Sequence, residues 1–198
     1  MMGQLLETFC LLDGELLNLP YHSARVGRSL GREYPITPFT DVVSREVNRL
    51  GATKGKWRAS ITYTWQGIES IKLTPYRLPQ ITSFRLIDIE DNFYSKKWAD
   101  RSRLDEYKNL LPQGVEPIFV LKGQITDTSF TNILVERDGK LYTPSTPLLL
   151  GTKRDKLLSD GTIHSIPLSS AELHTYERIH LINAMLDPGE VALPLSVI

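Results

Sequence analysis

The 198-residue sequence contains a single cysteine, Cys10, and therefore cannot form a disulfide within the chain. Chains without disulfides are typical of reducing compartments, so we expect a cytoplasmic protein. No apolar run approaches the roughly 20 residues that a membrane-spanning helix requires. The start shows no basic segment followed by an apolar core and a small-residue cleavage site. The sequence therefore predicts neither a transmembrane helix nor a signal peptide.

An excess of charge of one sign is also missing. The 23 basic and 23 acidic residues cancel, which argues against electrostatic binding of nucleic acid or of anionic membranes. The four histidines show neither an HExxH motif nor the paired spacing of metal ligands, so we expect no metal site. The patterns GxxxxGK[ST], GxGxxG and GxSxG are absent too. The sequence thus lacks the usual phosphate-loop, dinucleotide and serine-hydrolase signals.

The sequence contains patterns that predict β-hairpins mixed with helices. Apolar alternation and turn signals predict strands over residues 4–12, 15–19, 57–65, 68–73, 84–89, 117–121, 133–136 and 140–142. Helices are predicted over 21–33, 40–50, 102–111, 152–158 and 170–174, with Asp41 and Ser102 as candidate caps of the second and third. Residues 178–186 fit either a buried strand or a buried helix. This mixture favours an α+β fold over a doubly wound parallel sheet.

Two prolines, Pro75 and Pro79, interrupt the strand pattern and mark a hinge within residues 75–90. We therefore expect a smaller N-terminal α/β domain over residues 1–85 and a larger C-terminal domain over residues 86–198. A chain of this length has room for two small domains.

Lys96 and Lys97 are candidates for covalent chemistry. A lysine that attacks a carbonyl must be partly neutral, which apolar surroundings or a nearby cation favour. Lys97 precedes Trp98, and Arg101 is close by. On a strand, neighbouring residues point to opposite faces, so only one of the two lysines can enter a site. Taken alone, the segment fits two solvated surface lysines better.

Asp127 lies in a stretch of hydroxyl side chains, which suit the wall of a polar pocket. A carboxylate there could keep the ring nitrogen of a cofactor protonated through a charge-assisted hydrogen bond. Further on, Gly151 and Thr152 precede a helical pattern, and a helix N-terminus suits a phosphate. Arg25 could add a bidentate contact to that phosphate. A solvated turn at Asp127 and an ordinary capped helix after Gly151 are the simpler alternatives.

Pyridoxal phosphate needs an amine, an acid and donors for its phosphate. The order of these groups along the chain resembles that in the class IV (fold type IV) pyridoxal-phosphate-dependent aminotransferase family. That family includes branched-chain and D-amino-acid aminotransferases and aminodeoxychorismate lyase. The resemblance covers nearly the whole chain through the following segments: Leu6-Glu7-Thr8-Phe9, Asp13-Gly14, Asn18-Leu19, Tyr21 to Arg25, Lys97 to Arg101, Gly123 to Ser129, Asn132-Ile133, Thr143-Pro144, Leu149 to Arg154, and Asn183-Ala184-Met185.

The resemblance implies cofactor contacts. Lys97 corresponds to the lysine that holds the cofactor as an imine, Arg25 to the phosphate-binding arginine, and Asp127 to the acid at the ring nitrogen. The backbone of Thr152 and Lys153 corresponds to the phosphate-binding turn, and Asn183 lies where a small polar residue near the phosphate is expected. It also implies the two-domain α+β fold of D-amino-acid aminotransferase, with a shortened N-terminal domain, a cofactor cleft between the domains and a homodimer.

For the reaction, the resemblance favours 4-amino-4-deoxychorismate lyase, which releases 4-aminobenzoate and pyruvate and belongs to folate biosynthesis. The segments Asn183-Ala184-Met185 and Lys97 to Arg101 are most similar to that branch. The first alternative is a transaminase that exchanges an amino group between an amino acid and a 2-oxo acid. Arg58 and Arg77 are candidate carboxylate binders, although surface positions suit them better. The second alternative is a non-catalytic relative, because Asp127 replaces the usual glutamate and the chain is short.

Overall fold

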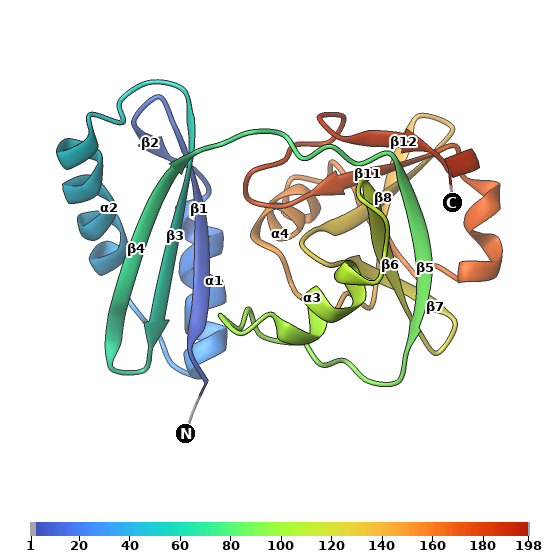
Figure 1. Cartoon of the computed structure of the whole chain (residues 1–198), viewed down its shortest axis with the longest axis horizontal. Helices are drawn as coiled ribbons and strands as arrows, with labels where there is room; N and C mark the ends of the chain where they lie inside the picture. The colour runs from blue at the N-terminus through green and yellow to red at the C-terminus, as the bar shows by residue number, and fades with distance from the viewer. Residues whose placement is uncertain (1–2, 198) are drawn as a thin grey trace. The chain divides into compact units, whose positions relative to one another are not determined.

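The computed structural model describes residues 3–197. It contains two compact units, one formed by Met1–Arg77 with Lys96–Asp100 and the other by Leu78–Ser95 with Arg101–Ile198. The short segment Lys96–Asp100 therefore belongs to the first unit, although the residues on both sides of it along the chain belong to the second (Figure 1). The division into domains at residues 85 and 86 stays a prediction.

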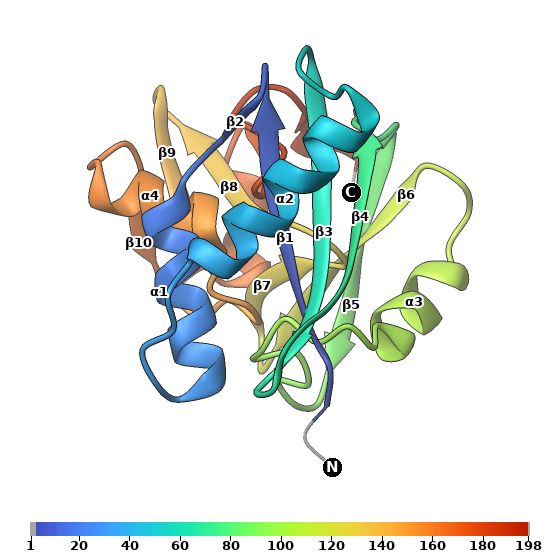
Figure 2. The same ribbon diagram turned by 90° about the vertical axis from the view of Figure 1, so that its left-hand side faces the viewer.

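The first unit is a four-stranded antiparallel sheet in the order β2-β1-β3-β4. Its strands are β1 (Leu5–Leu12), β2 (Glu15–Leu16), β3 (Lys56–Thr64) and β4 (Gly67–Pro75). Two helices, α1 (Leu19–Leu30) and α2 (Thr37–Leu50), lie on one face of this sheet (Figure 2). The expected hairpin after β1 is present, but β2 is two residues long and stops before α1 begins.

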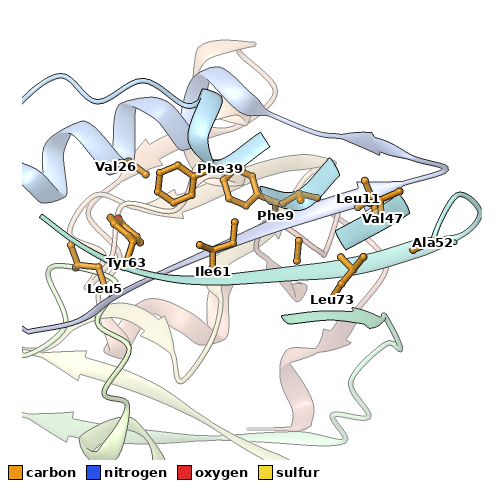
Figure 3. Packing of buried hydrophobic residues seen from close by; sticks show 12 residues of the cluster. Leu5, Phe9, Leu11, Val26, Phe39, Val47, Ala52, Ile61, Tyr63 and Leu73 are labelled. Atoms are coloured by element: carbon orange, nitrogen blue, oxygen red, sulfur yellow. The ribbon is translucent and has the colours of Figure 1, made fainter. Parts of the chain in front are cut away.

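The core of the first unit lies between the sheet and the two helices. Along β1, the alternate residues Leu5, Phe9 and Leu11 are buried, as the period of a strand requires. The Phe39 ring of α2 lies 6.0 Å from the ring of Phe9 and 5.2 Å, edge to face, from that of Tyr63. Figure 3 shows this cluster. Each large apolar side chain buried in this way contributes about 1.5–3 kcal/mol, so the core fixes both helices on the sheet.

The helix boundaries correct three expectations. Helix α1 ends at Gly31, which has a left-handed φ of 68°, and does not continue to residue 33. Helix α2 begins earlier than expected, with Ile36 as its N-cap and a proline in its first turn, so Asp41 is not a cap. Ser102 lies inside helix α3 (Ser102–Asn109), whose N-cap is Arg101. A left-handed glycine sets the end of α1, and a proline in the first turn marks the start of α2.

The second unit is built on an eight-stranded sheet, in which β10-β9-β8-β7-β6-β5 form one path and β11 pairs with β8 and β12. Two pairs, β5 with β6 and β9 with β10, are parallel, and the others are antiparallel. Its strands are β5 (Ser83–Ile89), β6 (Val115–Leu121), β7 (Gln124–Thr128), β8 (Asn132–Arg137), β9 (Lys140–Pro144), β10 (His164–Ile166), β11 (Arg178–Ile182) and β12 (Ala192–Pro194). The expected α+β class is confirmed.

Helices complete the second unit. They are α3, α4 (Thr152–Ser159) and the 3₁₀ segments η1 (Ser170–Thr175) and η2 (Leu195–Val197). The side chain of Ser169 accepts a hydrogen bond from the Ala171 N–H, so Ser169 caps η1. Residues 178–182 form a strand, which settles the ambiguity of that segment. Within residues 3–197, no helix combines the length and the apolar character needed to cross a membrane.

Candidate functional site

The lysine-bearing segment runs along the free edge of β1. The Leu6 N–H donates to the Lys97 carbonyl at 2.8 Å, and the Ala99 N–H donates to the Gln4 carbonyl at 2.8 Å. Trp98 forms an antiparallel bridge with Leu5. The backbone of Lys97 is thereby fixed to a central strand of the first unit, although the two segments lie about ninety residues apart in the sequence.

The two neighbouring lysines differ in their contacts. The Lys96 ammonium donates a 2.9 Å hydrogen bond to the Ser29 carbonyl in α1 and lies 5.8 Å from the centre of the Trp98 ring. The charge of Lys97 is close enough to His22 to act on its proton affinity. Lys96 therefore has a structural partner in a helix, while the neighbourhood of Lys97 is that of a buried polar cluster.

This cluster consists of Glu7, His22 and Arg25, all of them buried in the first unit. His22 and Arg25 are three residues apart on α1, so they share a face of the helix. His22 Nδ1 lies 2.5 Å from Glu7 Oε1. Arg25 Nε donates to Glu7 Oε2 at 3.2 Å, and Arg25 Nη2 donates to Glu7 Oε1. Glu7 thus holds the guanidinium at two points, and the Nη1 group of Arg25 takes part in neither bond.

Charges and burial set the protonation of this cluster. Burial alone would raise the pKa of Glu7, but the charge of Arg25 and the hydrogen bond from His22 outweigh it and lower that pKa to about 2. Burial lowers the pKa of His22 although Glu7 opposes it, and the charges of Arg25 and Lys97 lower it further. His22 is therefore neutral at neutral pH. Its Nε2 atom is buried and has no hydrogen-bond partner in the described part of the chain.

Asp127 lies in the second unit, where it forms the single residue pair between β7 and β8 with Asn132. Asp127 Oδ1 accepts a 2.8 Å hydrogen bond from Asn132 Nδ2, and Oδ2 accepts one of 2.8 Å from the Leu149 N–H. The residue is 4% exposed. Burial raises its pKa to about 7, although these hydrogen bonds and the charge of Arg154 oppose the change. Asp127 can therefore hold or release a proton near neutral pH.

A second buried carboxylate, Glu116, fixes the turn that follows Asp127. Glu116 Oε1 accepts a 3.0 Å bond from the Ser129 N–H and another from the Ser129 hydroxyl, while Oε2 pairs with Lys108 Nζ at 2.9 Å. Arg101 Nη2 donates to the Ser129 carbonyl at 2.9 Å. Ser129 is thus held through its N–H, its hydroxyl and its carbonyl, which makes the turn beside Asp127 rigid.

The N-terminus of α4 follows the same loop. Gly151 is its N-cap, and the first intrahelical hydrogen bond runs from the Asp155 N–H to the Gly151 carbonyl. The N–H groups of the three residues between them have no carbonyl partner in the helix. The Thr152 hydroxyl is buried, with Thr152 1% exposed, and has no partner in the part of the chain that the structure describes. This end of α4 therefore presents donors suited to an anion.

Side chains after Thr152 are already bound. Lys153 pairs with Asp187, and Arg154 donates to the carbonyl of Pro144 at 2.9 Å and to the hydroxyl of Thr143 at 3.3 Å. Their contribution to an anion site would therefore come from the backbone. This agrees with the backbone role expected for Thr152 and Lys153, which stays a prediction.

Asn183 shapes a turn and also contacts the loop beside Asp127. Its Oδ1 accepts a 2.8 Å bond from the Met185 N–H, and its Nδ2 donates to the Phe130 carbonyl at 3.3 Å. Arg58 lies exposed on β3, and Arg77 is exposed at the end of the first unit. The structure assigns these two arginines no contact with the clusters described above.

The predicted residues thus fall into two groups. Arg25 and Lys97 belong to the first unit, and Asp127 belongs with Thr152, Lys153 and Asn183 to the second. Sequence reasoning did not single out Glu7 or Glu116. A signal for Glu7 was present, since a lone acid on the apolar face of a strand demands a partner.

One cavity of about 760 Å³ lies in the first unit. It is lined by residues of α1 and of the loop that follows: Ser23, Ala24, Gly27, Arg28, Arg32, Glu33, Tyr34 and Pro35. No predicted site residue lines it, and the buried face of α1 that carries Arg25 is not part of its wall. We therefore assign it no role in the chemistry.

Known proteins resemble this chain over nearly its whole length. The model of the family described as amino-transferase class IV matches residues 4–192. An uncharacterised protein of Haemophilus influenzae is 30% identical over 93% of this chain and 98% of its own. A crystal structure described as a "putative 4-amino-4-deoxychorismate lyase" from Haemophilus somnus 129PT has 27% identity and a TM-score of 0.82, covering 93% of this chain and 97% of that one.

A more distant structure shares the fold. The pyridoxal-phosphate-bound form of a hypothetical aminotransferase from Mycobacterium tuberculosis has a TM-score of 0.75 and 17% identity, and covers 98% of this chain but 80% of that one. The expected fold of type IV, in a shortened form, is therefore confirmed. The two Haemophilus chains are matched over almost all of their own length, so the short form occurs in other proteins too.

Proposed function

Because the chain belongs to the amino-transferase class IV family, a family of pyridoxal-phosphate-dependent enzymes, we propose that it is a 4-amino-4-deoxychorismate lyase. In that reaction the substrate is cleaved to 4-aminobenzoate and pyruvate. The family that the motifs predicted is confirmed, and the enzyme class follows from it. The particular reaction is the proposal.

The residues present fit pyridoxal phosphate. The best single observation is the buried Thr152 hydroxyl, which has no partner within residues 3–197 and lies beside the unpaired N–H groups that open α4. A hydroxyl left unpaired in a protein interior is costly, and a phosphate oxygen would satisfy it. Glu7 binds the Nε and Nη2 groups of Arg25, and on this proposal the Nη1 donors would bind an anion. When bound, the cofactor supplies an electron sink that stabilises a carbanion at the substrate.

Two side chains would carry the remaining chemistry. Lys97 would bind the cofactor carbonyl covalently and, once displaced by the amino group of the substrate, would move a proton as a free amine. Asp127 would face the ring nitrogen and keep it protonated. With a pKa of about 7 caused by burial, its carboxyl group exchanges a proton easily at neutral pH. A protonated ring next to a carboxylate forms a charge-assisted hydrogen bond, which strengthens the electron sink.

The lyase assignment is supported by motif similarity and by one comparison. The segments Lys97 to Arg101 and Asn183-Ala184-Met185 resemble the lyase branch. The Haemophilus somnus chain, which is described as a putative lyase of this kind, matches this chain with 27% identity over nearly its full length. On this proposal, the enzyme acts in folate biosynthesis and takes a small-molecule amino substrate.

The transaminase remains the second candidate, because the matching family is described by that activity. Both reactions use the same cofactor residues, and they differ in the groups that contact the substrate. Arg58 and Arg77 are proposed as carboxylate binders for either substrate. Assays with 4-amino-4-deoxychorismate, and with amino acids plus 2-oxoglutarate, separate the two reactions by their products.

The first experiment is a spectrum of the purified protein with added pyridoxal phosphate, followed by borohydride reduction and peptide mapping. We expect an imine absorption band and a reduced adduct on Lys97. Lys97→Ala should lose both, while the matched control Lys96→Ala should keep both. A wild-type protein without a band would overturn the cofactor assignment and favour a non-catalytic relative.

We further propose a cytoplasmic homodimer, as in the family resemblance, with domain boundaries near residues 85 and 86. Light scattering on the purified protein tests the oligomeric state directly. A monomer at micromolar concentration would contradict the dimer. Limited proteolysis with mass spectrometry tests the domain boundary, because cleavage concentrates in exposed linkers between folded domains.

A further inference from the structure

Asn132 connects two parts of the second unit that the sequence keeps apart. Its Nδ2 donates to Asp127 Oδ1 at 2.8 Å and also to the Leu149 carbonyl at 2.8 Å. The Leu149 N–H in turn donates to Asp127 Oδ2 at 2.8 Å. Strand β7, strand β8 and the turn before α4 are therefore closed into one ring of hydrogen bonds. Both amide protons of Asn132 are used, so the orientation of its amide is determined.

Gly151 fits tightly against this amide. A Cβ atom added at Gly151 would lie 2.0 Å from Asn132 Oδ1 and 3.1 Å from its Cγ, and the third neighbour within 4 Å is Asn132 Nδ2. The backbone at Gly151 is extended, with a φ of −77° that any residue adopts. Glycine is therefore required here because of one neighbouring side chain, and the backbone conformation does not demand it.

We propose that Asn132 is a positioning residue that fixes the carboxyl group of Asp127 against the turn at Gly151, and thereby sets the spacing between the ring-nitrogen acid and the phosphate turn. This inference rests on the proposed function. It adds to the site a residue that acts through its neighbours, because both donors of its amide are bound to Asp127 and Leu149. Gly151 serves the same purpose, because only a residue without a Cβ lets the amide lie where it reaches both acceptors.

The charge state of Asp127 reports on the same contact. The groups that act on this carboxyl are the Asn132 amide from β8, the backbone of Leu148 and Leu149, and the charge of Arg154 in α4. The Asn132 bond favours the charged form, so its loss should raise the pKa of Asp127 further. A residue that merely filled space would leave this pKa unchanged.

A double-mutant cycle on the cofactor-free protein tests the contact. Gly151→Ala should lower the thermal midpoint in the wild-type background, because the Asn132 amide must turn and lose both acceptors. In the Asn132→Ala background the same substitution should cost little, because the three heavy atoms nearest to the added Cβ, the severe contact at 2.0 Å among them, all belong to the Asn132 amide. Strong non-additivity supports the inference. Additive effects would overturn it.

Two further measurements separate positioning from stability. In the cofactor-free protein, carbon-13 titration should show the Asp127 midpoint shifted upward in Asn132→Ala and Gly151→Ala. The control Asn92→Ala removes another amide, which donates to the Leu148 carbonyl at 3.2 Å, and should shift the midpoint less than Asn132→Ala does, because Asn92 has no hydrogen bond to Asp127 itself. Asn132→Ser provides a milder variant should Asn132→Ala fail to fold. An unchanged midpoint in every Asn132 variant would overturn the inference.

Binding of pyridoxal phosphate is then titrated by fluorescence. The dissociation constant should rise about tenfold in Asn132→Ala, as expected when a hydrogen bond to an ionised group is lost, and should stay near the wild-type value in Asn92→Ala. Equal losses in both variants would contradict the positioning role. A wild-type protein that binds no pyridoxal phosphate would overturn the proposed function and the cofactor role of Asn132, while the cycle would still decide whether Asn132 fixes Asp127.

Discussion

The ammonium of Lys96 donates its hydrogen bond to the carbonyl of Ser29, so one of two adjacent lysines is committed to helix α1. Its neighbour Lys97 is held by its backbone to Leu6 in β1. Neither lysine lies in a strand of the structure, so the alternation of a strand does not explain why their contacts differ, and the choice of Lys97 as the cofactor lysine stays a prediction.

Removal of the Lys96 ammonium should affect stability and leave the covalent chemistry intact. Lys96→Ala loses the bond to Ser29, so we expect the free energy of unfolding to fall by about 1 kcal/mol. Urea denaturation measures this loss. Borohydride should still trap the cofactor on Lys97 in this variant. If the adduct is lost in Lys96→Ala and kept in Lys97→Ala, Lys96 would be the lysine that binds the cofactor.

The ionisation of Glu7 should control how the free energy of unfolding changes with pH under acidic conditions. Its pKa is about 2 in the folded protein, where the charge of Arg25 and the bond from His22 overcome burial, against an ordinary value of 4.5. A lowered pKa means that the stabilising contribution is present above about pH 4.5 and is lost as the pH falls towards 2. Glu7→Gln should flatten stability over that interval.

At pH 7, Glu7→Gln should also destabilise the protein by roughly 3–5 kcal/mol, because Arg25 loses its buried counter-ion. Urea denaturation from pH 2 to pH 7 gives both quantities. The variant Glu46→Gln, which removes the half-buried partner of the exposed Arg49, is the control and should cost less than about 1 kcal/mol, because the pair remains in contact with solvent. Equal losses in the two variants would contradict the buried pair.

The ionisation of Asp127 should change the stability with pH in the opposite direction to that of Glu7. Burial raises its folded pKa to about 7 from an ordinary 3.8, so between these values the folded protein binds more protons than the unfolded chain. Its contribution to stability therefore falls as the pH rises from about 4 to about 7. Asp127→Asn cannot titrate, and we expect this fall to vanish. Denaturation of the cofactor-free protein across the interval measures it, and an unchanged slope would refute the assignment.

Restoration of the longer acid of the family should be harmful in this chain. Asp127→Glu adds a methylene where Asn132 and the Leu149 N–H already bind both oxygens of a residue that is 4% exposed. Overpacking of a buried site costs about 1–3 kcal/mol. We expect a lower unfolding midpoint and weaker cofactor binding than in the wild type. A variant as stable as the wild type would show that the loop adapts to either acid.

The Thr152 hydroxyl should matter for the phosphate and not for the fold. Thr152→Val keeps the shape and removes a group that has no partner in the described structure, so stability should be unchanged or slightly higher. Affinity for pyridoxal phosphate should fall about tenfold. The control Thr143→Val removes a hydroxyl bonded to the Ile133 carbonyl at 3.0 Å and should destabilise instead. Loss of stability without loss of affinity in Thr152→Val would contradict the phosphate site.

Sequence patterns predicted the elements whose side chains alternate or repeat on one face. Strand β1 and helix α4 are examples, since apolar spacing and a preceding glycine mark them clearly. Strand β7 was missed because Thr126 and Asp127 are polar and yet buried. Their burial depends on partners far along the chain, such as the Phe119 carbonyl that accepts the Thr126 hydroxyl at 2.9 Å. A pattern of apolar and polar residues along one segment cannot show that a polar side chain finds its hydrogen-bond partner in another segment.

The candidate site shows the same division. Residue type and order were sufficient to select Lys97, Arg25 and Asp127, because the chemistry restricts which side chains can serve. Neighbours that hold these residues, such as Glu7 and Asn132, are selected by geometry. A buried carboxylate and a two-donor amide have no distinctive local pattern, so their roles emerge only when the contacts are known.

The pairing of residues 96–99 with β1 bears on how the protein is made. During synthesis, β2 can pair early with the C-terminal end of the outer edge of β1, but the part of that edge at Leu5 and Leu6 meets residues 96–99 only after the ribosome has produced about another ninety residues. An unpaired strand edge is a site for mispairing with other chains, and pairing over such a separation forms slowly. The nascent chain therefore carries an open edge for much of its synthesis. Strand β1, which later pairs with the backbone of the Lys97 segment, is thus also the first place where a chaperone could prevent mispairing.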